Sequence, residues 1–372
     1  MLVEAADMDA GPLHVLDLPQ LYLRPSADAL LDALNIVALE PISWDVNNAK
    51  LQPTLPRVHP EGLTKYLTSI VASSLRWIED YDLKEKIWEL ASVRLSERSG
   101  RTVFFAKAQP AMSRTFDIPL TPSTTASITL HEPSLTADNL GLKTWASSYL
   151  LSRRLHLLQL PHSSSEDFRP RVLELGSGTG LVGIAAATVW GAQVHLTDLP
   201  EIVTNLAHNV DANLSVINEN SGKATTGVLD WTQFSTDTPL SALSTPWSSP
   251  SFANLPSSSE FYPTILAADP LYSPAHPQLL VQTINALLSR TPGARVVVEL
   301  PLREAYMPEI EEFGARMHDI GLLVLDEGEE VGFDDWGGGA EDGGGLREVR
   351  CWWGIWGWAA NKQEAVNGDV GR

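Results

Sequence analysis

The sequence has a single cysteine, few positive charges and no long apolar run, and each of these absences excludes something. Because Cys351 has no second cysteine to pair with, the chain cannot form an internal disulfide, which suits a reducing compartment. No apolar stretch approaches the roughly 20 residues that a membrane helix needs. The opening residues carry acids where a secretory signal would carry positive charge. We therefore expect a soluble, cytoplasmic protein without a membrane partner.

Basic residues are scarce relative to acidic ones. The chain has 26 Lys and Arg against 46 Asp and Glu, which gives a net charge of −20. Most affinity for nucleic acid comes from neutralising phosphates, so this charge disfavours a nucleic-acid partner. A basic protein partner fits the charge better, although solubility alone also explains it. We predict no metal site.

The first part of the chain, residues 1–125, has the apolar spacing of helices and no residues that suggest chemistry. Ser26 is placed to cap a helix over Ala27–Leu34. A second helix fits an apolar face from Leu63 to Ile78, and a third fits Leu83 to Leu95, with Gly100 placed to stop it. We interpret this part as a mainly helical extension for packing or partner recognition.

The second part, residues 126–372, alternates strands with helices. A mostly parallel sheet with helices on both faces is expected from such alternation, and two consecutive strands at the end predict an antiparallel finish. Short β-like runs at Thr102–Ala106 and Ser127–His131 precede this α/β pattern, and Ser/Pro-rich or Gly-rich loops interrupt it at Ser235–Glu260 and Gly337–Gly345. The expected strands are Arg171–Leu175, Gln193–Thr197, Val228–Trp231, Thr264–Ala268, Arg295–Leu300, Leu322–Leu325 and Glu348–Trp358; the helices are Ala146–Leu158, Leu181–Trp190, Glu201–Ala212, Pro277–Ser289 and Tyr306–Ile320.

The strongest local signal is a hydrophobic strand that enters a glycine-rich turn and then a helix, Val172-Leu-Glu-Leu-Gly-Ser-Gly-Thr-Gly180. Glycines at such a turn let the backbone bend sharply and approach a ligand closely. Eighteen residues past Gly180 the next strand ends at Asp198. A carboxylate at that position can accept hydrogen bonds from both ribose hydroxyls of an adenosine. Together these residues predict a nucleoside site.

Two cofactor classes compete for this turn. Gly178-Thr-Gly-Leu-Val-Gly183 matches the dinucleotide fingerprint of NAD enzymes, which alone is weak evidence. Against NAD, Glu174 lies just before the glycines, where it would repel a pyrophosphate, and the first turn begins at Gly176, earlier than the fingerprint requires. A cationic sulfonium nucleoside suits both features. We favour S-adenosylmethionine and keep a dehydrogenase as the alternative.

Two further strand ends carry residues of interest. Leu229-Asp230-Trp231 ends the third strand, where the indole can stack on an adenine and the carboxylate can accept from its amino group; a core role for the indole remains open. The fourth strand runs into Asp269-Pro-Leu-Tyr272, close to the [Asn/Asp]-Pro-Pro-[Tyr/Phe] signature of enzymes that methylate nitrogen. An amine nucleophile has to lose its proton, be aligned and be shielded from water. A carboxylate can accept a hydrogen bond from the nitrogen, and an aromatic ring favours a cationic or desolvated amine. A plain turn after a strand would also fit.

With these motifs assembled, residues from about Ser127 to the end resemble lysine methyltransferase family 16 of the seven-β-strand, class I S-adenosylmethionine-dependent methyltransferases. Trp145, before the first helix, is part of the likeness. The resemblance implies a Rossmann-like, seven-stranded sheet, with Asp269 and Tyr272 at the target amine. The predicted cofactor-binding residues are Trp145, Glu174, Gly176, Ser177, Gly178, Gly180, Asp198, Leu199, Asp230, Trp231 and Ala268.

Within that family the helical extension and the segment Leu135-Thr-Ala-Asp-Asn-Leu-Gly-Leu-Lys-Thr-Trp145 look most like fungal enzymes that methylate a lysine of translation elongation factor 2. The resemblance therefore implies a protein substrate, with an elongation factor favoured. Two other classes of function remain open. Asp-Pro-Leu-Tyr also resembles adenine N6 methyltransferases, which act on nucleic acid, and a cofactor fold can serve as a non-catalytic scaffold.

Overall fold

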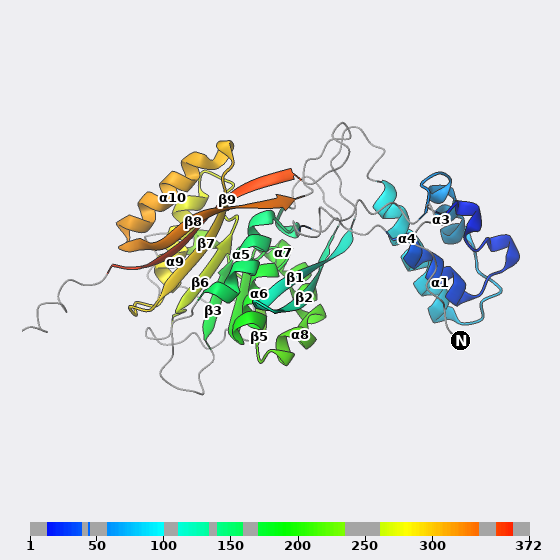
Figure 1. Cartoon of the computed structure of the whole chain (residues 1–372), viewed down its shortest axis with the longest axis horizontal. Coiled ribbons are helices and arrows are strands. Elements are labelled where there is room, and N and C mark those ends of the chain that lie inside the picture. The colour runs from blue at the N-terminus through cyan, green and yellow to red at the C-terminus, as the bar shows by residue number, and fades with distance from the viewer. Residues whose placement is uncertain are drawn as a thin grey trace, which may run out of the picture. The chain divides into compact units, whose positions relative to one another are not determined.

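The computed structural model describes residues 13–38, 44, 58–99, 111–133, 140–158, 170–234, 261–334 and 347–359. Contacts divide the chain into two compact units, with the boundary between Met112 and Ser113 (Figure 1). We expected this boundary after residue 125; it lies earlier because β1 (Met112–Thr121) pairs with β2 (Thr124–Glu132) in a two-stranded sheet. The strand expected at Thr102–Ala106 and the loops expected at Ser235–Glu260 and Gly337–Gly345 lie outside the described residues.

The first unit is helical, as predicted. Its helices are α1 (Ala27–Ile36), α3 (Leu63–Ala72) and α4 (Tyr81–Ser99), and Ser26 caps α1 by accepting a hydrogen bond from the amide of Ala29. Their apolar faces meet in one core that includes Leu30, Leu34, Leu67, Ile70 and Ile87.

The helix predicted from Leu63 to Ile78 was too long. The chain leaves the helix at Ser73, whose backbone is extended. The Ser73 hydroxyl accepts a hydrogen bond from the amide of Leu75, which has a left-handed φ of 42°. A serine that bonds its own local backbone competes with helix continuation.

The second unit is built on a seven-stranded sheet with the order β5-β4-β3-β6-β7-β9-β8. The strands β3 to β7 pair in parallel, and β9 is antiparallel to both of its neighbours. This confirms the α/β, mostly parallel sheet with an antiparallel finish. The strands are β3 (Arg171–Leu175), β4 (Gln193–Asp198), β5 (Lys223–Val228), β6 (Thr264–Ala268), β7 (Arg295–Pro301), β8 (Leu322–Asp334) and β9 (Arg347–Trp358).

Helices cover both faces of this sheet (Figure 1). On one side α9 and α10 bury a large apolar core with Leu173, Ile265, Val298, Phe313 and Trp356. The other side carries α5, α6, α7 and α8. The bounds are α5 (Ala146–Arg154), α6 (Leu181–Trp190), α7 (Pro200–Ala212), α8 (Leu214–Glu219), α9 (His276–Leu287) and α10 (Met307–Asp319); the short α8 was not predicted. Among the described helices, none is long and apolar enough to cross a membrane.

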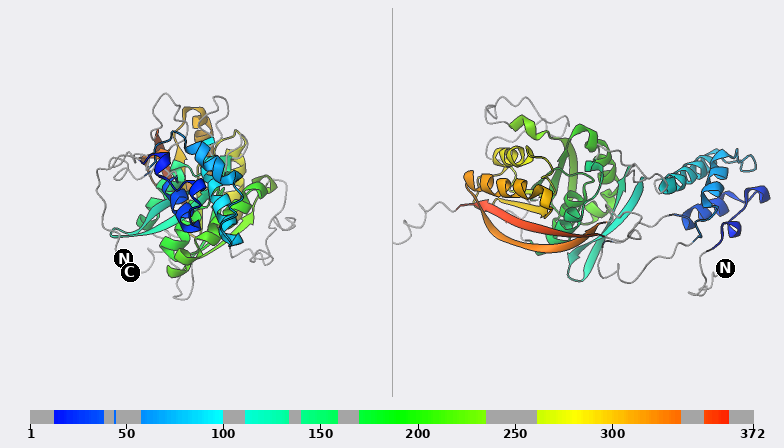
Figure 2. Two further views of the ribbon diagram at one scale, coloured as in Figure 1. Left: turned by 90° about the vertical axis from the view of Figure 1, so that its right-hand side faces the viewer. Right: turned by 90° about the horizontal axis from the view of Figure 1, so that it is seen from above.

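Two strand predictions need correction. The third strand is β5, Lys223–Val228, and not Val228–Trp231, because the chain turns into a short 3₁₀ helix at Trp231–Phe234. The strand predicted at Leu322–Leu325 continues to Asp334. Acidic residues interrupt the hydrophobic pattern after Leu325, so the pattern did not predict the rest of the strand. These acids belong to an edge strand, which tolerates charge on its exposed side. Figure 2 shows the long, curved β8–β9 pair along one side of the unit.

Candidate functional site

The turn after β3 needs its glycines. Gly176, Gly178 and Gly180 have φ of 68°, 55° and 93°, values that side chains rarely adopt. A Cβ on Gly178 would lie 3.0 Å from the carbonyl oxygen of Gly141, and one on Gly180 would lie 2.7 Å from a methyl of Leu206. Gly180 then caps α6, so the turn presents backbone amides at the start of a helix. A cradle of this kind fits a nucleoside ligand close to the backbone.

Asp198 ends β4 beside this turn. One carboxylate oxygen accepts from the amide of Gly178 at 2.7 Å, and the other accepts from the amide of Leu199 at 2.7 Å. Burial nevertheless raises the pKa of Asp198 to about 6. Each carboxylate oxygen keeps a second lone pair, so both remain available to a pair of hydroxyls. The structure thus brings Asp198 to the glycines, and Leu199 follows it with a side chain that is 37% exposed.

Ser177 and Glu174 lie beneath the turn. The Ser177 hydroxyl accepts from the amide of Thr197, and one Glu174 oxygen accepts from the amide of Gly183 at 3.0 Å. Burial raises the pKa of Glu174 to about 8, although hydrogen bonds to the carboxyl oppose the rise. Only 2% of Glu174 is exposed, so its carboxyl braces the first turn of α6 from inside. Its assignment to the cofactor site stays a prediction.

Trp231 lies over the first glycine of the turn. A Cβ on Gly176 would be 3.4 Å from the indole, and the ring of His276 meets the indole edge-on at 5.8 Å. The neighbouring Asp230 uses one oxygen to accept from both the amide and the hydroxyl of Thr232. Trp231 also packs partly against the main core. The indole therefore serves the core and the turn together.

Asp269 and Tyr272 emerge at the end of β6, after the half-buried Ala268. Asp269 has a left-handed φ of 52°, and its amide donates to the carbonyl of Glu299 at 2.9 Å. Its carboxylate is already partly engaged, because Arg303 donates a hydrogen bond to each of its oxygens. Burial raises the pKa of Asp269, and Arg303 opposes this rise.

Tyr272 is 47% exposed and lies edge-on against His276, with ring centroids 4.3 Å apart. Burial raises the pKa of Tyr272, and the charges of Asp198 and Asp269 raise it further. The Tyr272 phenol therefore lies within electrostatic range of Asp198 at the end of β4 and of Asp269 after β6. The chain Trp231–His276–Tyr272 links the predicted adenine side to the predicted amine side by ring contacts.

Trp145 precedes α5 and lies against the side chain of Arg303, whose guanidinium carbon is 5.1 Å from the ring centroid. Arg303 follows β7 and was not predicted. The rule that ligands bind outside the carboxyl ends of parallel strands could have singled it out, because β7 is the next strand after β6 in the sheet.

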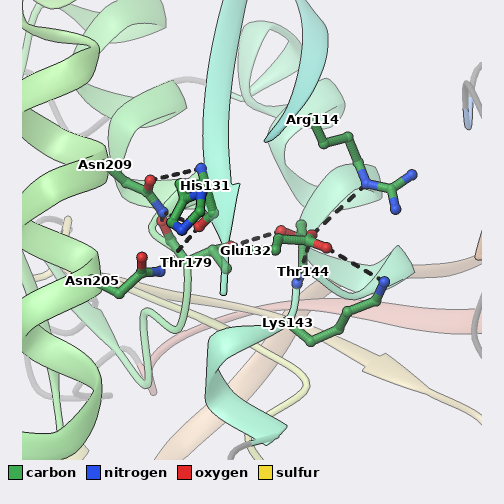
Figure 3. Close-up of polar contacts among 8 residues, drawn as sticks. All are labelled: Arg114, His131, Glu132, Lys143, Thr144, Thr179, Asn205 and Asn209. Atoms are coloured by element: carbon green, nitrogen blue, oxygen red, sulfur yellow. Dashed lines mark hydrogen bonds and ion pairs between the residues drawn. The ribbon is translucent and has the colours of Figure 1, made fainter. Parts of the chain in front are cut away.

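Polar residues that were not among the predicted site residues hold the glycine turn from the side of the β1–β2 hairpin (Figure 3). The hydroxyls of Thr144 and Thr179 are 2.8 Å apart, and the amide nitrogen of Asn209 donates to the carbonyl of Thr179 at 2.9 Å. Glu132, at the end of β2, accepts from the amide of Thr144 and forms an ion pair with Lys143. Thr179 lies within the glycine motif, but the motif did not signal its contacts, and no motif signalled Asn209, since these contacts depend on elements that are distant along the chain.

Comparison with known proteins places the chain among relatives of one kind. A family model described as lysine methyltransferase matches residues 124–244. The protein-lysine N-methyltransferase rrg1 of Schizosaccharomyces pombe is 32% identical over 340 residues, which cover 91% of this chain and 97% of rrg1. The protein-lysine N-methyltransferase EFM2 of Saccharomyces cerevisiae is 36% identical over 298 residues, 75% of this chain and 64% of EFM2.

A third relative matches a shorter stretch. The EEF1A lysine methyltransferase 3 of Mus musculus is 37% identical over 102 residues, 27% of this chain and 41% of the mouse enzyme. The match to rrg1, by contrast, spans nearly the whole of both proteins. The glycine turn, the acid that ends β4 and the Asp-Pro-Leu-Tyr segment after β6 all lie at the carboxyl ends of parallel strands, where open α/β sheets bind ligands. The chain belongs to the lysine methyltransferase family and is an S-adenosylmethionine-dependent protein-lysine N-methyltransferase.

Proposed function

We propose that the end of β6 receives the target lysine, with Asp269 accepting a hydrogen bond from its amine and Tyr272 packing on its terminal methylenes. The observation that carries this proposal is the pairing of a buried carboxylate with a half-exposed phenol directly after the strand. The charge of Asp269 raises the pKa of Tyr272, and the charge of Asp198 at the glycine turn raises it as well. The amine and the ribose would thus be held side by side.

The cofactor-binding residues are part of the same proposal. S-adenosylmethionine supplies an electrophilic methyl group on a sulfonium when it is bound. We assign the ribose hydroxyls to Asp198, the adenine to Trp231 and Asp230, and close backbone approach to Gly176, Gly178 and Gly180. Leu199, Ala268 and Trp145 would border the ligand, whereas Glu174 and Ser177 would shape the turn from beneath, as their hydrogen bonds suggest.

The favoured substrate is a translation elongation factor, elongation factor 2 before others, methylated in the cytoplasm. The segment leading to Trp145 and the helical first unit carry the likeness to elongation factor 2 enzymes, and the mouse relative named above is an EEF1A methyltransferase. A net charge of −20 suits a basic partner surface. The same charge argues against RNA, which the Asp-Pro-Leu-Tyr segment alone would allow.

The test is methyl transfer from labelled cofactor to purified elongation factor 2, purified elongation factor 1A and total RNA in parallel. We expect label on elongation factor 2, lost when the modified lysine, located by mass spectrometry, is replaced by Arg. Asp269→Asn should lower turnover by about 100-fold, if positioning contributes on the order of 3 kcal/mol, with cofactor affinity within a few fold. Asp326→Asn on the exposed edge strand is the matched control. Label on RNA alone would refute the protein substrate, and unchanged turnover in Asp269→Asn would move the amine site elsewhere.

A further inference from the structure

Arg303 contacts both Asp269, where we place the amine, and Trp145, one of the predicted cofactor-binding residues. One terminal nitrogen of its guanidinium donates to one Asp269 oxygen at 2.9 Å, and the other donates to the second oxygen at 3.3 Å. The same guanidinium lies over the ring of Trp145 at 5.1 Å. Its side chain is 29% exposed and that of Asp269 is 6% exposed, so the pair is largely shielded from water. Exposed ion pairs contribute little, but a shielded two-point contact fixes geometry.

Both partners are held by their backbones. The amide of Asp269 donates to Glu299, two residues before the end of β7, and the amide of Arg303 donates to the carbonyl of Pro301 at the end of that strand. The pair therefore ties the end of β6 to the end of β7. A carboxylate that accepts two hydrogen bonds from an arginine still has a lone pair free on each oxygen, so Asp269 can accept from an incoming amine while Arg303 stays in place.

The titratable groups around Asp269 come from the ends of β6, β7 and β8 and from β9. Arg303 follows β7, Asp334 ends β8, Cys351 lies on β9, and Tyr272 follows β6. Burial and Asp334 raise the pKa of Asp269, and Arg303 lowers it. Cys351 is buried with a raised pKa, so it stays a neutral thiol. Without Arg303, the carboxyl would take up a proton more readily or, if ionised, bind a cation more strongly.

Methyl transfer requires the uncharged amine. The amine lone pair forms the new N–C bond, the electron pair of the S–C bond stays on sulfur, and the ammonium proton has to leave to water beforehand. A free lysine has a pKa of about 10.4, and an unpaired buried carboxylate beside it would raise this value further. A carboxylate already neutralised by a guanidinium keeps its acceptor atoms without that penalty.

We propose that Arg303 is a positioning residue for methyl transfer: it neutralises and orients Asp269 so that the site accepts the uncharged lysine amine, and it fixes the ring of Trp145 beside it. This inference rests on the proposed function, in which Asp269 receives the amine. The effect of Arg303 on the protonation of Asp269 does not depend on substrate, so it can be measured in the free protein.

The first test therefore needs no substrate. Carbon-13 NMR of the protein labelled at Asp carboxyl groups, with Asp269 assigned by the loss of its signal in Asp269→Asn, follows the carboxyl through a pH titration. In Arg303→Met we expect the pKa of Asp269 to rise by about one unit or more, because the opposing cation is gone. Arg303→Lys should restore part of the shift. Arg316→Met is the matched control, since Arg316 also pairs with a carboxylate, that of Glu312, on an exposed helix face. An unchanged Asp269 pKa in Arg303→Met would overturn the inference.

The second test uses turnover on purified elongation factor 2. In Arg303→Met the turnover number should fall by about tenfold or more near neutral pH, and the rising limb of its pH profile should move up by about one unit, because both the carboxyl and the amine must be deprotonated. Loss of a merely structural residue would lower turnover equally at every pH, and that result would refute the role. Adding Arg303→Met to Asp269→Asn should cost little more, since Arg303 acts through Asp269. If Asp269→Asn alone keeps full turnover, the proposed function fails; if only Arg303→Met does, this inference fails.

Discussion

At the scale of single residues, the carboxylate of Asp198 both stabilises the glycine turn and is the group that we assign to the ribose. It holds the glycine turn through Gly178 and its own helix start through Leu199, and burial raises its pKa to about 6. Cofactor binding needs the carboxylate form, because only that form accepts hydrogen bonds with all of its lone pairs. A raised pKa in the free protein means that affinity is lost as the pH falls through that value.

We predict that the Kd for S-adenosylmethionine is flat above about pH 7 and rises about tenfold per unit below about pH 6, since binding then requires loss of one proton. Isothermal titration calorimetry in buffers of different ionisation enthalpy would also count the proton released. Asp198→Asn should bind more weakly at every pH and lose this dependence. Equal affinity at pH 5 and pH 8 in the natural sequence would remove Asp198 from the ribose.

Trp231 gives a second prediction at this scale. Its indole lies over Gly176 and contacts His276, and it also packs on the core. Loss of ring stacking costs roughly 0.5–1.5 kcal/mol beyond buried area, so Trp231→Ala should weaken cofactor binding by about tenfold and Trp231→Phe by less. Fluorescence titration with the cofactor measures both. Trp358→Phe, on β9 beside Arg290, is the control. A large fall in melting temperature with an unchanged Kd would make Trp231 a core residue only.

At the scale of elements, α7 holds the β1–β2 hairpin with asparagines instead of a neighbouring strand. Asn209 accepts from the amide of His131 at 2.8 Å and donates to its carbonyl at 3.1 Å, and Asn213 does the same for Thr129 at 3.0 and 2.8 Å. Asn209 also donates to Thr179 in the glycine turn. One buried side chain thus couples the hairpin to the cofactor loop, as Figure 3 shows.

Asn209→Leu should lower the free energy of unfolding by about 2–4 kcal/mol, because the amide of His131 and the buried carbonyl of Thr179 lose their bonds to Asn209, whereas the carbonyl of His131 keeps Asn205. It should also weaken cofactor binding, since the carbonyl of Thr179 is no longer held. Urea denaturation and calorimetry measure the two effects. Asn220→Ala on α8 removes a single local bond to Val216 and should cost much less. Equal stability of the two variants would show that the asparagine contacts do not hold the hairpin.

The sequence predicted this unit well wherever an element is buried and local. The strand Arg171–Leu175 and the helix Leu181–Trp190 agree with β3 and α6 in every residue, because their apolar runs end at glycines. It failed where the pattern is interrupted: β8 carries Asp326, Glu327 and Glu329 on an exposed edge, and β5 has a Thr-rich, half-buried pattern.

The site shows the same division. The glycines, Asp198 and Asp269 could be predicted as candidates because each ends or directly follows a strand that the sequence makes visible. Asn209 could not, because what identifies it is its partner across the fold and not its neighbours along the chain. Arg303 belongs to no motif, and only its place just after β7 could have singled it out. The burial of Glu174 likewise depends on how close α6 packs at Gly183, which sequence spacing does not give.

At the scale of the whole molecule, the chain has two compact units, and the residues of the candidate site all lie in the second. The first has its own apolar core, centred on buried leucines and isoleucines of α1, α3 and α4. Exposed apolar side chains also occur in it, Leu16, Tyr22 and Leu23 among them, each at least 70% exposed. A unit with its own core and without site residues is expected to serve recognition of the protein substrate.

Removing the first unit therefore separates cofactor binding from protein methylation, provided the cut respects the hairpin. A chain that begins at Ala111 keeps β1 and its pairing with β2. We predict that its affinity for the cofactor lies within a few fold of that of the full chain. Its methylation of elongation factor 2 should fall by about tenfold or more, mainly through a higher KM. A chain that begins at Ser123 lacks β1 with its buried Phe116 and Ile118, leaves one edge of β2 unpaired, and should have a lower Tm. The pair of truncations distinguishes lost recognition from lost folding. Full methylation by the chain from Ala111 would show that the first unit does not recognise the substrate, and weak cofactor binding in that chain would show that it supports the fold of the second.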